Sequence, residues 1–222
     1  MYKVAVVMEK GGVGKTTIAL NLAVAAGQKG HLAAVIDIDQ QATASKWTDR
    51  RTDDKPWVVP TLTARLPAAI KQAEENGVEF LVIDTPPHSG ADAVEAARRA
   101  DVVLIPVEPH LFTLETLPKL ADLLKLAGDP PAIFVINKAA TQGSEAQNAA
   151  EHIKKQGFNV APVVLHLRAA HRHATNVGQV AAEYDAGSKA AGEVMQLYVY
   201  TEKFIKAARK TNAETKPAHA RA

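Results

Sequence analysis

The chain has 222 residues, a length that suits one domain, and 47% of them are hydrophobic, enough for a sizeable core. It contains no cysteine, which excludes a disulfide framework, a thiolate metal site and a cysteine nucleophile. The formal net charge is only +2, so any role of positive charge must depend on local clusters. No apolar run approaches the ~20 residues of a membrane span, and the first residues read as a strand, so we expect neither a membrane span nor a signal peptide.

Apolar runs that fit buried strands alternate along the chain with segments of helical spacing. The predicted strands are residues 2–8, 31–39, 57–60, 80–84, 102–107, 132–137 and 160–165. The predicted helices are residues 18–26, 42–50, 62–75, 90–99, 114–126 and 145–156, and further helices fill the chain to about Lys210. This alternation predicts a mainly parallel, twisted sheet covered on both faces, a three-layer α/β/α fold. We expect residues 1–210 to form a single domain and residues 211–222 a loose tail.

A glycine-rich stretch, residues 9–17, joins the first predicted strand to the first predicted helix. Backbone N–H groups in such a turn can point at an anion, and the N-terminus of the following helix adds a favourable dipole. Lys15 can then reach the outer phosphates of a nucleotide, and the Thr16 hydroxyl can ligate Mg²⁺. The alternative is a glycine-rich turn without a ligand. The candidate nucleotide-binding residues here are Lys10, Gly11, Gly12, Val13, Gly14, Lys15, Thr16 and Thr17.

The stretch departs from the general P-loop pattern, which has glycine where this chain has Glu9. It fits a deviant form, Lys-Gly-Gly-x-Gly-Lys-Thr, that begins with a second lysine, Lys10. This form resembles the ParA/MinD family of ATPases. The resemblance covers about residues 2–210 and implies a P-loop NTPase-like fold, ATP and ADP as ligands, Mg²⁺, and slow ATP hydrolysis that a partner stimulates. Because the chain starts at the first predicted strand, we expect the short ParA type without an N-terminal helix-turn-helix domain.

Asp84 ends the predicted strand 80–84 and precedes a Thr-Pro-Pro sequence. Ligands bind at the carboxyl ends of the strands in such sheets, where a carboxylate can hold Mg²⁺ as a Walker B acid does. The Asp-x-Pro-Pro form also resembles the ParA family. A turn or helix N-cap aspartate is the alternative.

Asp37 and Asp39 stand two residues apart at the end of the predicted strand 31–39 and share a face if the strand continues that far. In the ParA family the matching stretch reads Asp-x-Asp-Pro-Gln, and this chain has Gln40 in place of the proline. The resemblance implies that Asp39 positions or activates the attacking water, and we count it with Thr16 and Asp84 as a candidate metal-site residue. A pair of strand-end capping residues is the alternative.

Two further roles come only from the resemblance. It implies that Lys10 reaches across a dimer interface to the partner's nucleotide, like an arginine finger in trans. The candidate catalytic residues are therefore Lys10, Lys15 and Asp39. The resemblance also implies that Asn137, at the end of the predicted strand 132–137, touches the adenine edge. A solvated lysine and a turn asparagine are the alternatives.

Basic residues gather in the C-terminal part of the chain. In the last predicted helix, Lys203, Lys206 and Lys210 lie on a different face from an apolar stripe, residues 194, 197, 198, 205 and 208. Such a stripe of lysines can neutralise DNA phosphates without reading bases, although a solvated helix face fits equally well. The resemblance favours DNA, and Arg168 and Arg172 are further candidates.

We therefore expect a DNA-partition ATPase that forms an ATP-bound homodimer, binds nonspecific DNA, answers to a ParB-type partner and works in the cytoplasm on the nucleoid. A ParA-like ATPase that positions a protein cargo is the alternative. A MinD-like membrane-associated regulator would need an amphipathic C-terminal helix, which residues 211–222 do not offer. Metabolic enzymes of the superfamily fit less well, because cysteine is absent and Lys10 is present.

Overall fold

The computed structural model describes residues 1–110 and 116–215. Seven strands form one sheet in the order β3-β2-β4-β1-β5-β6-β7, and all of their pairings are parallel. The strands are β1 (Tyr2–Val6), β2 (Ala33–Asp37), β3 (Trp57–Pro60), β4 (Phe80–Asp84), β5 (Val102–Val107), β6 (Ala132–Ile136) and β7 (Asn159–Val160).

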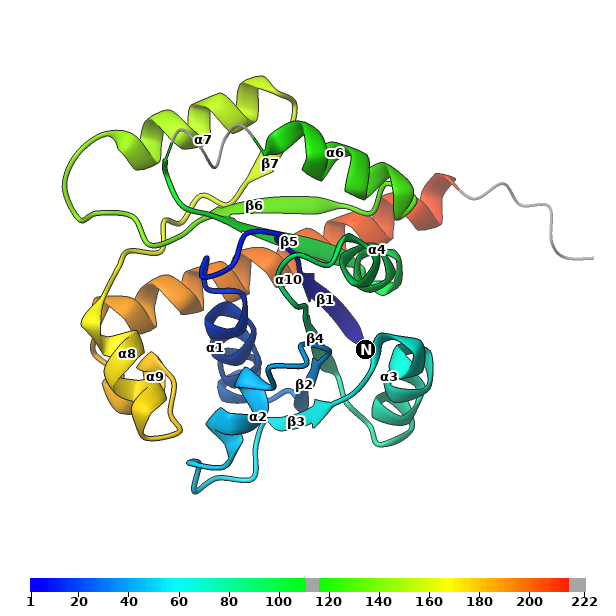
Figure 1. Ribbon diagram of the computed structural model, residues 1–222, viewed down its shortest axis with the longest axis vertical. Helices are drawn as coiled ribbons and strands as arrows, with labels where there is room; N and C mark the ends of the chain where they lie inside the picture. Colours follow the sequence, from blue (N-terminus) through cyan, green and yellow to red (C-terminus); the bar gives the residue numbers. More distant parts are fainter. Residues whose placement is uncertain (111–115, 216–222) are drawn as a thin grey trace, which may run out of the picture.

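Helices cover both faces of this sheet (Figure 1). The helices are α1 (Lys15–Gln28), α2 (Thr43–Thr48), α3 (Leu66–Glu75), α4 (Gly90–Arg99), α6 (Leu117–Leu126), α7 (Glu145–Lys155), α8 (Ala169–Asn176), α9 (Ala181–Tyr184) and α10 (Lys189–Thr215), with a 3₁₀ turn, η1 (Thr63–Arg65), before α3. Val4 and Val6 of β1 face a core shared with α1 and α10, whereas Ala5 faces a second core shared with α3, α4, α6 and α7. The three-layer α/β/α fold is therefore confirmed.

Four predicted strands run beyond the observed ones, namely residues 2–8 against β1, 31–39 against β2, 132–137 against β6 and 160–165 against β7. β2 ends at Asp37 rather than residue 39, because the Asp37 carboxylate accepts a hydrogen bond from the backbone of Asp39 and turns the chain. Of the predicted strand 160–165 only Val160 belongs to a strand, β7, since Pro162 has no N–H to continue the ladder.

Several helix boundaries also differ from the predictions. The predicted helix 62–75 starts as η1 and becomes α3 at Leu66, and the predicted helix 114–126 is observed as α6 from Leu117, its first two predicted residues lying outside the described chain. α10 extends to Thr215, into the stretch that was predicted to be a tail. Of its predicted core stripe, Val194, Leu197, Tyr198 and Ile205 are buried and Ala208 is half-buried.

Candidate functional site

The glycine-rich loop leaves the carboxyl end of β1 and becomes α1 at Lys15. Gly14, the residue before the helix, has a φ of 92°, a left-handed conformation that favours glycine. A side chain there would also meet Asn137, whose Nδ2 lies 2.6 Å from the place of a Cβ. The loop therefore presents the free N–H groups at the start of α1 at the carboxyl edge of the sheet, where an anion is favoured.

Lys15 is buried in this loop, with 7% of its surface exposed. Its Nζ donates to the backbone oxygen of Lys10 over 3.4 Å. Burial lowers the pKa of Lys15, and the negative charges of Asp84 and Asp39 oppose that shift. A poorly solvated ammonium with one carbonyl partner can gain strongly from a phosphate.

Asp84 lies at the end of β4, opposite Val6 of β1. Its side chain is fully buried, and neither carboxyl oxygen has a hydrogen-bond partner among the described residues. Burial raises the pKa of Asp84 to about 7, while the Thr16 hydroxyl, which faces it outside hydrogen-bonding geometry, opposes the shift. A buried carboxylate without a partner is costly. A divalent cation between Asp84 and Thr16 would remove that cost, so these two residues fit Mg²⁺.

The two carboxylates after β2 have different surroundings. Asp37 is buried, and its oxygens accept hydrogen bonds from the backbone N–H groups of Asp39 (3.0 Å) and Ala44 (3.2 Å), which fixes the turn into α2. Asp39 is half-buried and accepts a hydrogen bond from the backbone N–H of Gln41 over 2.9 Å. Only Asp39 has an open side, so it is the one of the pair that can meet a ligand.

A hollow of about 290 Å³ lies over the loop, and we call it the phosphate hollow. It brings together Lys15, Thr16 and Asp39, three of the residues that the sequence singled out, with Pro87 from the Asp-x-Pro-Pro stretch. The basic side chain of Lys138, which the sequence had not singled out, lies at the same hollow. Its full lining is Gly12, Gly14, Lys15, Thr16, Thr17, Asp39, Thr43, Pro87 and Lys138.

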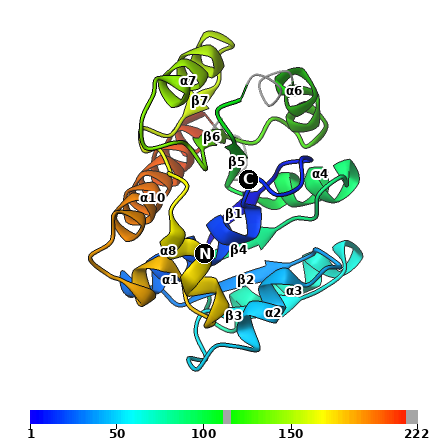
Figure 2. The same cartoon turned by 60° about the vertical axis from the view of Figure 1, so that its left-hand side comes forward.

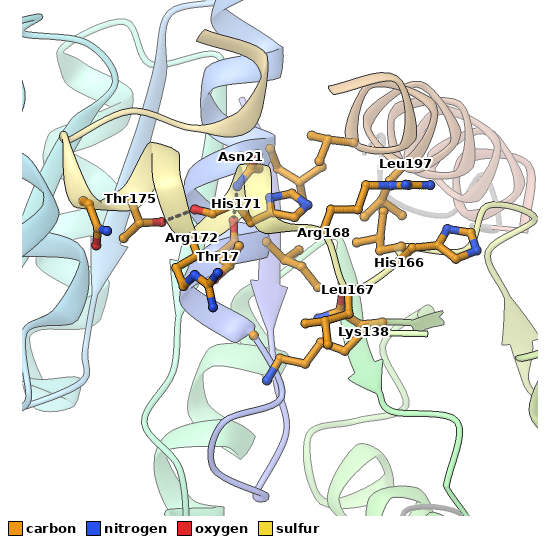
Figure 3. A pocket seen from close by; sticks show the side chains of 17 residues that line it. Thr17, Asn21, Lys138, His166, Leu167, Arg168, His171, Arg172, Thr175 and Leu197 are labelled. Carbon is orange, nitrogen blue, oxygen red and sulfur yellow. Dashed lines mark hydrogen bonds between the residues drawn. The ribbon is translucent and has the colours of Figure 1, made fainter. Parts of the chain in front are cut away.

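A second cavity, also of about 290 Å³, is lined by residues of α1, α8 and α10, and we call it the α1–α8 cavity (Figure 3). The ribbons of these three helices can be followed in Figure 2. It shares Gly14, Thr17 and Lys138 with the phosphate hollow, so the two spaces adjoin at the start of α1. Asn21 Oδ1 and His171 Nδ1 are buried there without a hydrogen-bond partner in the described chain. An apolar space with a few unpaired polar atoms suits a nucleobase. In the sequence, Asn21 stands out only as a lone polar residue in the apolar run 18–26. Nothing in the sequence indicated that His171 would lie at a cavity.

Asn137 lies at the wall of this cavity and is buried. Its Nδ2 donates to the backbone oxygen of Val13 over 2.7 Å, so the amide holds the glycine-rich loop against the end of β6. Its predicted contact with an adenine edge stays a prediction.

Lys10 does not line the phosphate hollow of its own chain. Its side chain is 43% exposed, and Nζ lies 3.4 Å from Glu108 Oε2. An exposed lysine on the rim can reach outward, as the predicted role in a dimer requires.

The five predicted DNA contacts lie in two places. Arg168 and Arg172 line the α1–α8 cavity, where Arg168 is paired with Glu193 at 2.6 Å and Arg172 is exposed. The three lysines of α10 lie further along that helix. Lys206 pairs with Glu202 at 3.0 Å, and its ammonium lies over the ring of Tyr2. Tyr2 is at the amino end of β1, whereas the glycine-rich loop follows the carboxyl end of this strand, so the lysines lie at the opposite end of the strands from the loop. Lys203 and Lys210 are exposed on the same segment.

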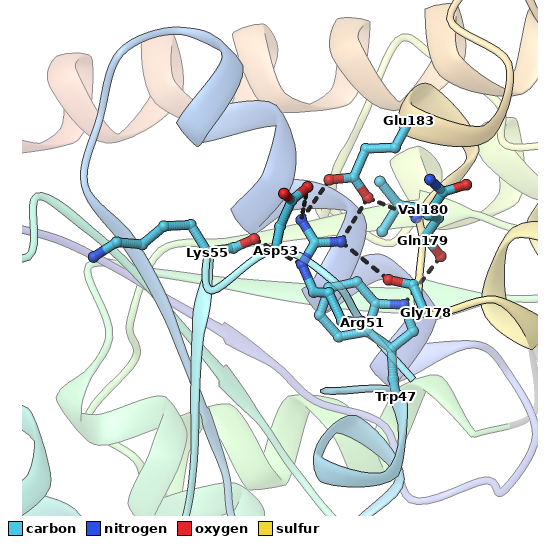
Figure 4. A network of polar contacts seen from close by, with 8 residues as sticks. All are labelled: Trp47, Arg51, Asp53, Lys55, Gly178, Gln179, Val180 and Glu183. Carbon is cyan, nitrogen blue, oxygen red and sulfur yellow. Dashed lines mark hydrogen bonds and ion pairs between the residues drawn. The ribbon is translucent and has the colours of Figure 1, made fainter. Parts of the chain in front are cut away.

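A polar network that the sequence analysis missed joins α2 and the turn after it to α9 and the segment before that helix (Figure 4). The guanidinium of Arg51 makes two hydrogen bonds to Glu183, at 2.8 and 2.5 Å, and stacks 4.6 Å from the ring centre of Trp47. Trp47 Nε1 donates to the backbone oxygen of Gln179 over 3.0 Å. Since α2 follows the turn at Asp39, the network ties this turn to the helices around the α1–α8 cavity.

The parallel sheet, the glycine-rich loop at β1 and the buried acid at β4 together define a P-loop nucleotide-binding protein. A family model described as the CobQ/CobB/MinD/ParA nucleotide binding domain matches residues 4–179, and the chain belongs to this family of P-loop ATPases. The predicted resemblance is therefore confirmed.

Two relatives and one solved structure are similar to this chain. A protein named Maintenance of carboxysome distribution protein A, from Gloeobacter kilaueensis, is 30% identical over 178 residues, which is 79% of this chain and 81% of the relative. The chromosome-partitioning ATPase Soj of Thermus thermophilus is 25% identical over 217 residues, 80% of this chain and 87% of the relative. The septum site-determining protein MinD of Pyrococcus horikoshii, solved with Mg-ADP, shares the fold at a TM-score of 0.73 and 20% identity, covering 93% of this chain and 98% of its own. Within residues 1–110 and 116–215, no helix is both long and apolar enough to cross a membrane.

Proposed function

We propose that this chain is a Mg²⁺-dependent positioning ATPase whose ATP-bound form is a homodimer that binds DNA without sequence preference. The observation that carries the proposal is the buried carboxyl of Asp84, which has no hydrogen-bond partner in the described chain and faces Thr16, next to Lys15 and the phosphate hollow. When bound, Mg²⁺ neutralises charge on the outer phosphates of ATP. Thr16 and Asp84 are the residues that would hold it, and Lys15 binds the same phosphates.

Hydrolysis depends on Asp39 in this proposal. Its half-buried carboxylate lines the phosphate hollow, and the hydrogen bond from Gln41 orients it. A carboxylate in that place can orient or deprotonate the attacking water. Lys10, on the rim of the hollow, supplies positive charge to the phosphates of the partner protomer, which couples dimerisation to ATP.

DNA binding follows dimerisation, because two protomers double the number of phosphate contacts and each contact adds roughly −0.9 to the salt slope of log K. The exposed Arg172 lines the α1–α8 cavity, whereas Lys203, Lys206 and Lys210 lie near the amino ends of the strands, away from the glycine-rich loop. If dimers form across the nucleotide face, two copies of Arg172 come close together and the lysine groups stay apart. We therefore favour Arg172 as the stronger DNA contact. A chain that binds DNA in this way would lie on the nucleoid in the cytoplasm.

The cargo is DNA bound by a ParB-type partner, or a protein assembly. The similarity to Soj supports the first, and the similarity to a carboxysome distribution protein supports the second. The product of a neighbouring gene, added to an ATPase assay with and without its own DNA site, distinguishes them. Stimulation that requires the site indicates partition, and stimulation without DNA indicates a protein cargo.

The test of the switch is binding to a duplex of arbitrary sequence, measured against salt with ATP and with ADP. We expect tight binding only with ATP, loss of binding in Lys15→Ala because nucleotide no longer binds, and loss in Lys10→Ala because the protein stays monomeric. Arg172→Ala should lower the salt slope more than the joint replacement of Lys203, Lys206 and Lys210 by alanine. Equal affinity in both nucleotide states would refute the switch.

A further inference from the structure

Lys138 directly follows Asn137 at the end of β6, and its φ of 53° is a left-handed conformation uncommon for a residue other than glycine. The chain is fixed on both sides of it. The N–H of Asn137 donates to Val107 over 2.8 Å, and the N–H of Ala139 donates to Leu165 over 3.1 Å. Such conformations persist where the surroundings impose them, and they cluster at functional sites. The backbone therefore delivers this lysine to a defined place.

The side chain of Lys138 reaches over the glycine-rich loop (Figure 3). Its Nζ donates to the backbone oxygen of Gly12 and lies 3.4 Å from Glu108 Oε1, and 37% of the side chain is exposed. Lys138 lines both the phosphate hollow and the α1–α8 cavity, as do Gly14 and Thr17. A molecule that occupies both spaces must pass this ammonium group.

Glu108 faces two lysines at once. Its Oε2 lies 3.4 Å from Lys10 Nζ and its Oε1 lies 3.4 Å from Lys138 Nζ. One carboxylate against two ammonium groups leaves an excess of positive charge at the rim of the phosphate hollow. Partly exposed ion pairs of this kind contribute only about 0.2–1 kcal/mol, so a polyphosphate with several charges can displace Glu108.

We propose that Lys138 is a further nucleotide ligand, which binds the phosphate chain of the nucleotide in its own protomer and which Glu108 and Gly12 hold in place before the nucleotide arrives. The inference rests on the nucleotide binding proposed above. Lys138 thus supplies in cis a charge of the kind that Lys10 supplies in trans. A lysine suits this task because its ammonium is a compact point charge on a flexible stem.

The experiment titrates the full chain with fluorescent ADP and ATP analogues, and with adenosine by competition, at low and high salt. Lys138→Met removes the charge and keeps the apolar stem, and Lys138→Arg restores a cation. The matched control is Lys125→Met on α6, an exposed lysine paired loosely with Asp122 at 3.9 Å. We expect Lys138→Met to weaken the binding of both nucleotides about tenfold, a change of about 1.4 kcal/mol, because the variant loses a hydrogen bond to a charged group.

The same variant should flatten the salt dependence and leave adenosine affinity unchanged. Lys138→Arg should recover most of the affinity, and Lys125→Met should match the parent. Unchanged nucleotide binding in Lys138→Met would overturn the role of Lys138, and so would an equal loss for adenosine, which would mean that the side chain only holds the loop. A parent chain that binds neither nucleotide would instead refute the proposed ATPase.

Discussion

Asp84→Asn tests the buried acid at the end of β4. The pKa of Asp84 is raised from 3.8 to about 7, so the folded chain holds a proton that the unfolded chain releases between these values. As the pH rises, the folded chain therefore loses stability, starting near the pKa of the unfolded chain, and this loss is complete above the pKa of the folded chain. At about 1.36 kcal/mol per unit, this loss amounts to on the order of 4 kcal/mol above about pH 7. Asn removes the charge, so the free energy of unfolding should rise relative to the parent, and the gain should grow by about 3 kcal/mol between about pH 5 and pH 8.

The assay is urea unfolding of both proteins across that pH range without metal or nucleotide. Asp122→Asn, whose side chain is 75% exposed, is the control and should show no such pH dependence. With Mg²⁺ and ADP present, the parent should gain stability and Asp84→Asn should gain much less, because its amide cannot replace the carboxylate at the cation. A difference between variant and parent that does not change with pH would refute the account of Asp84.

Two further variants test the framework of the site. Gly14→Ala forces a side chain into a left-handed position 2.6 Å from Asn137 Nδ2, so we expect a loss of about 1–3 kcal/mol in chemical unfolding and a loss of Mg-ADP binding; parental nucleotide affinity would contradict this. Arg51→Ala leaves Glu183 without its double hydrogen bond, and we expect a loss of about 3–5 kcal/mol, against less than about 1 for Lys71→Ala in an exposed pair. Equal losses in these two variants would show that the contact between Arg51 and Glu183 contributes little.

The layer order and most strands could be predicted because strands buried on both faces leave continuous apolar runs, as at residues 80–84 and 102–107. The glycine-rich loop could be predicted for a related reason, since Lys15 and Thr16 are close in sequence and their chemistry needs close spacing. Boundaries set by single hydrogen bonds could not be predicted. The end of β2 depends on the contact between Asp37 and Asp39, which alternation of residues does not reveal.

Contacts between distant residues were also beyond the sequence. Nothing in the chain indicated that Glu108 would face both Lys10 and Lys138, or that Arg51 would pair with Glu183. Each of these residues looks like an ordinary surface charge until the fold brings its partner near. The predicted DNA contacts show the same limit. Sequence alone did not reveal that the lysines of α10 and the arginines Arg168 and Arg172 lie in different places on the fold.

The central claim is that ATP, and not ADP, drives two copies of this chain together. Sedimentation velocity of Asp39→Ala with Mg²⁺ and either nucleotide tests it most directly, because this change removes the proposed water-activating carboxylate, while Lys15 remains for the phosphates and Asp84 for Mg²⁺. The account predicts a stable dimer with ATP, a monomer with ADP, and a monomer with either nucleotide when Lys10→Ala is added. A variant that sediments alike with ATP and ADP would contradict it.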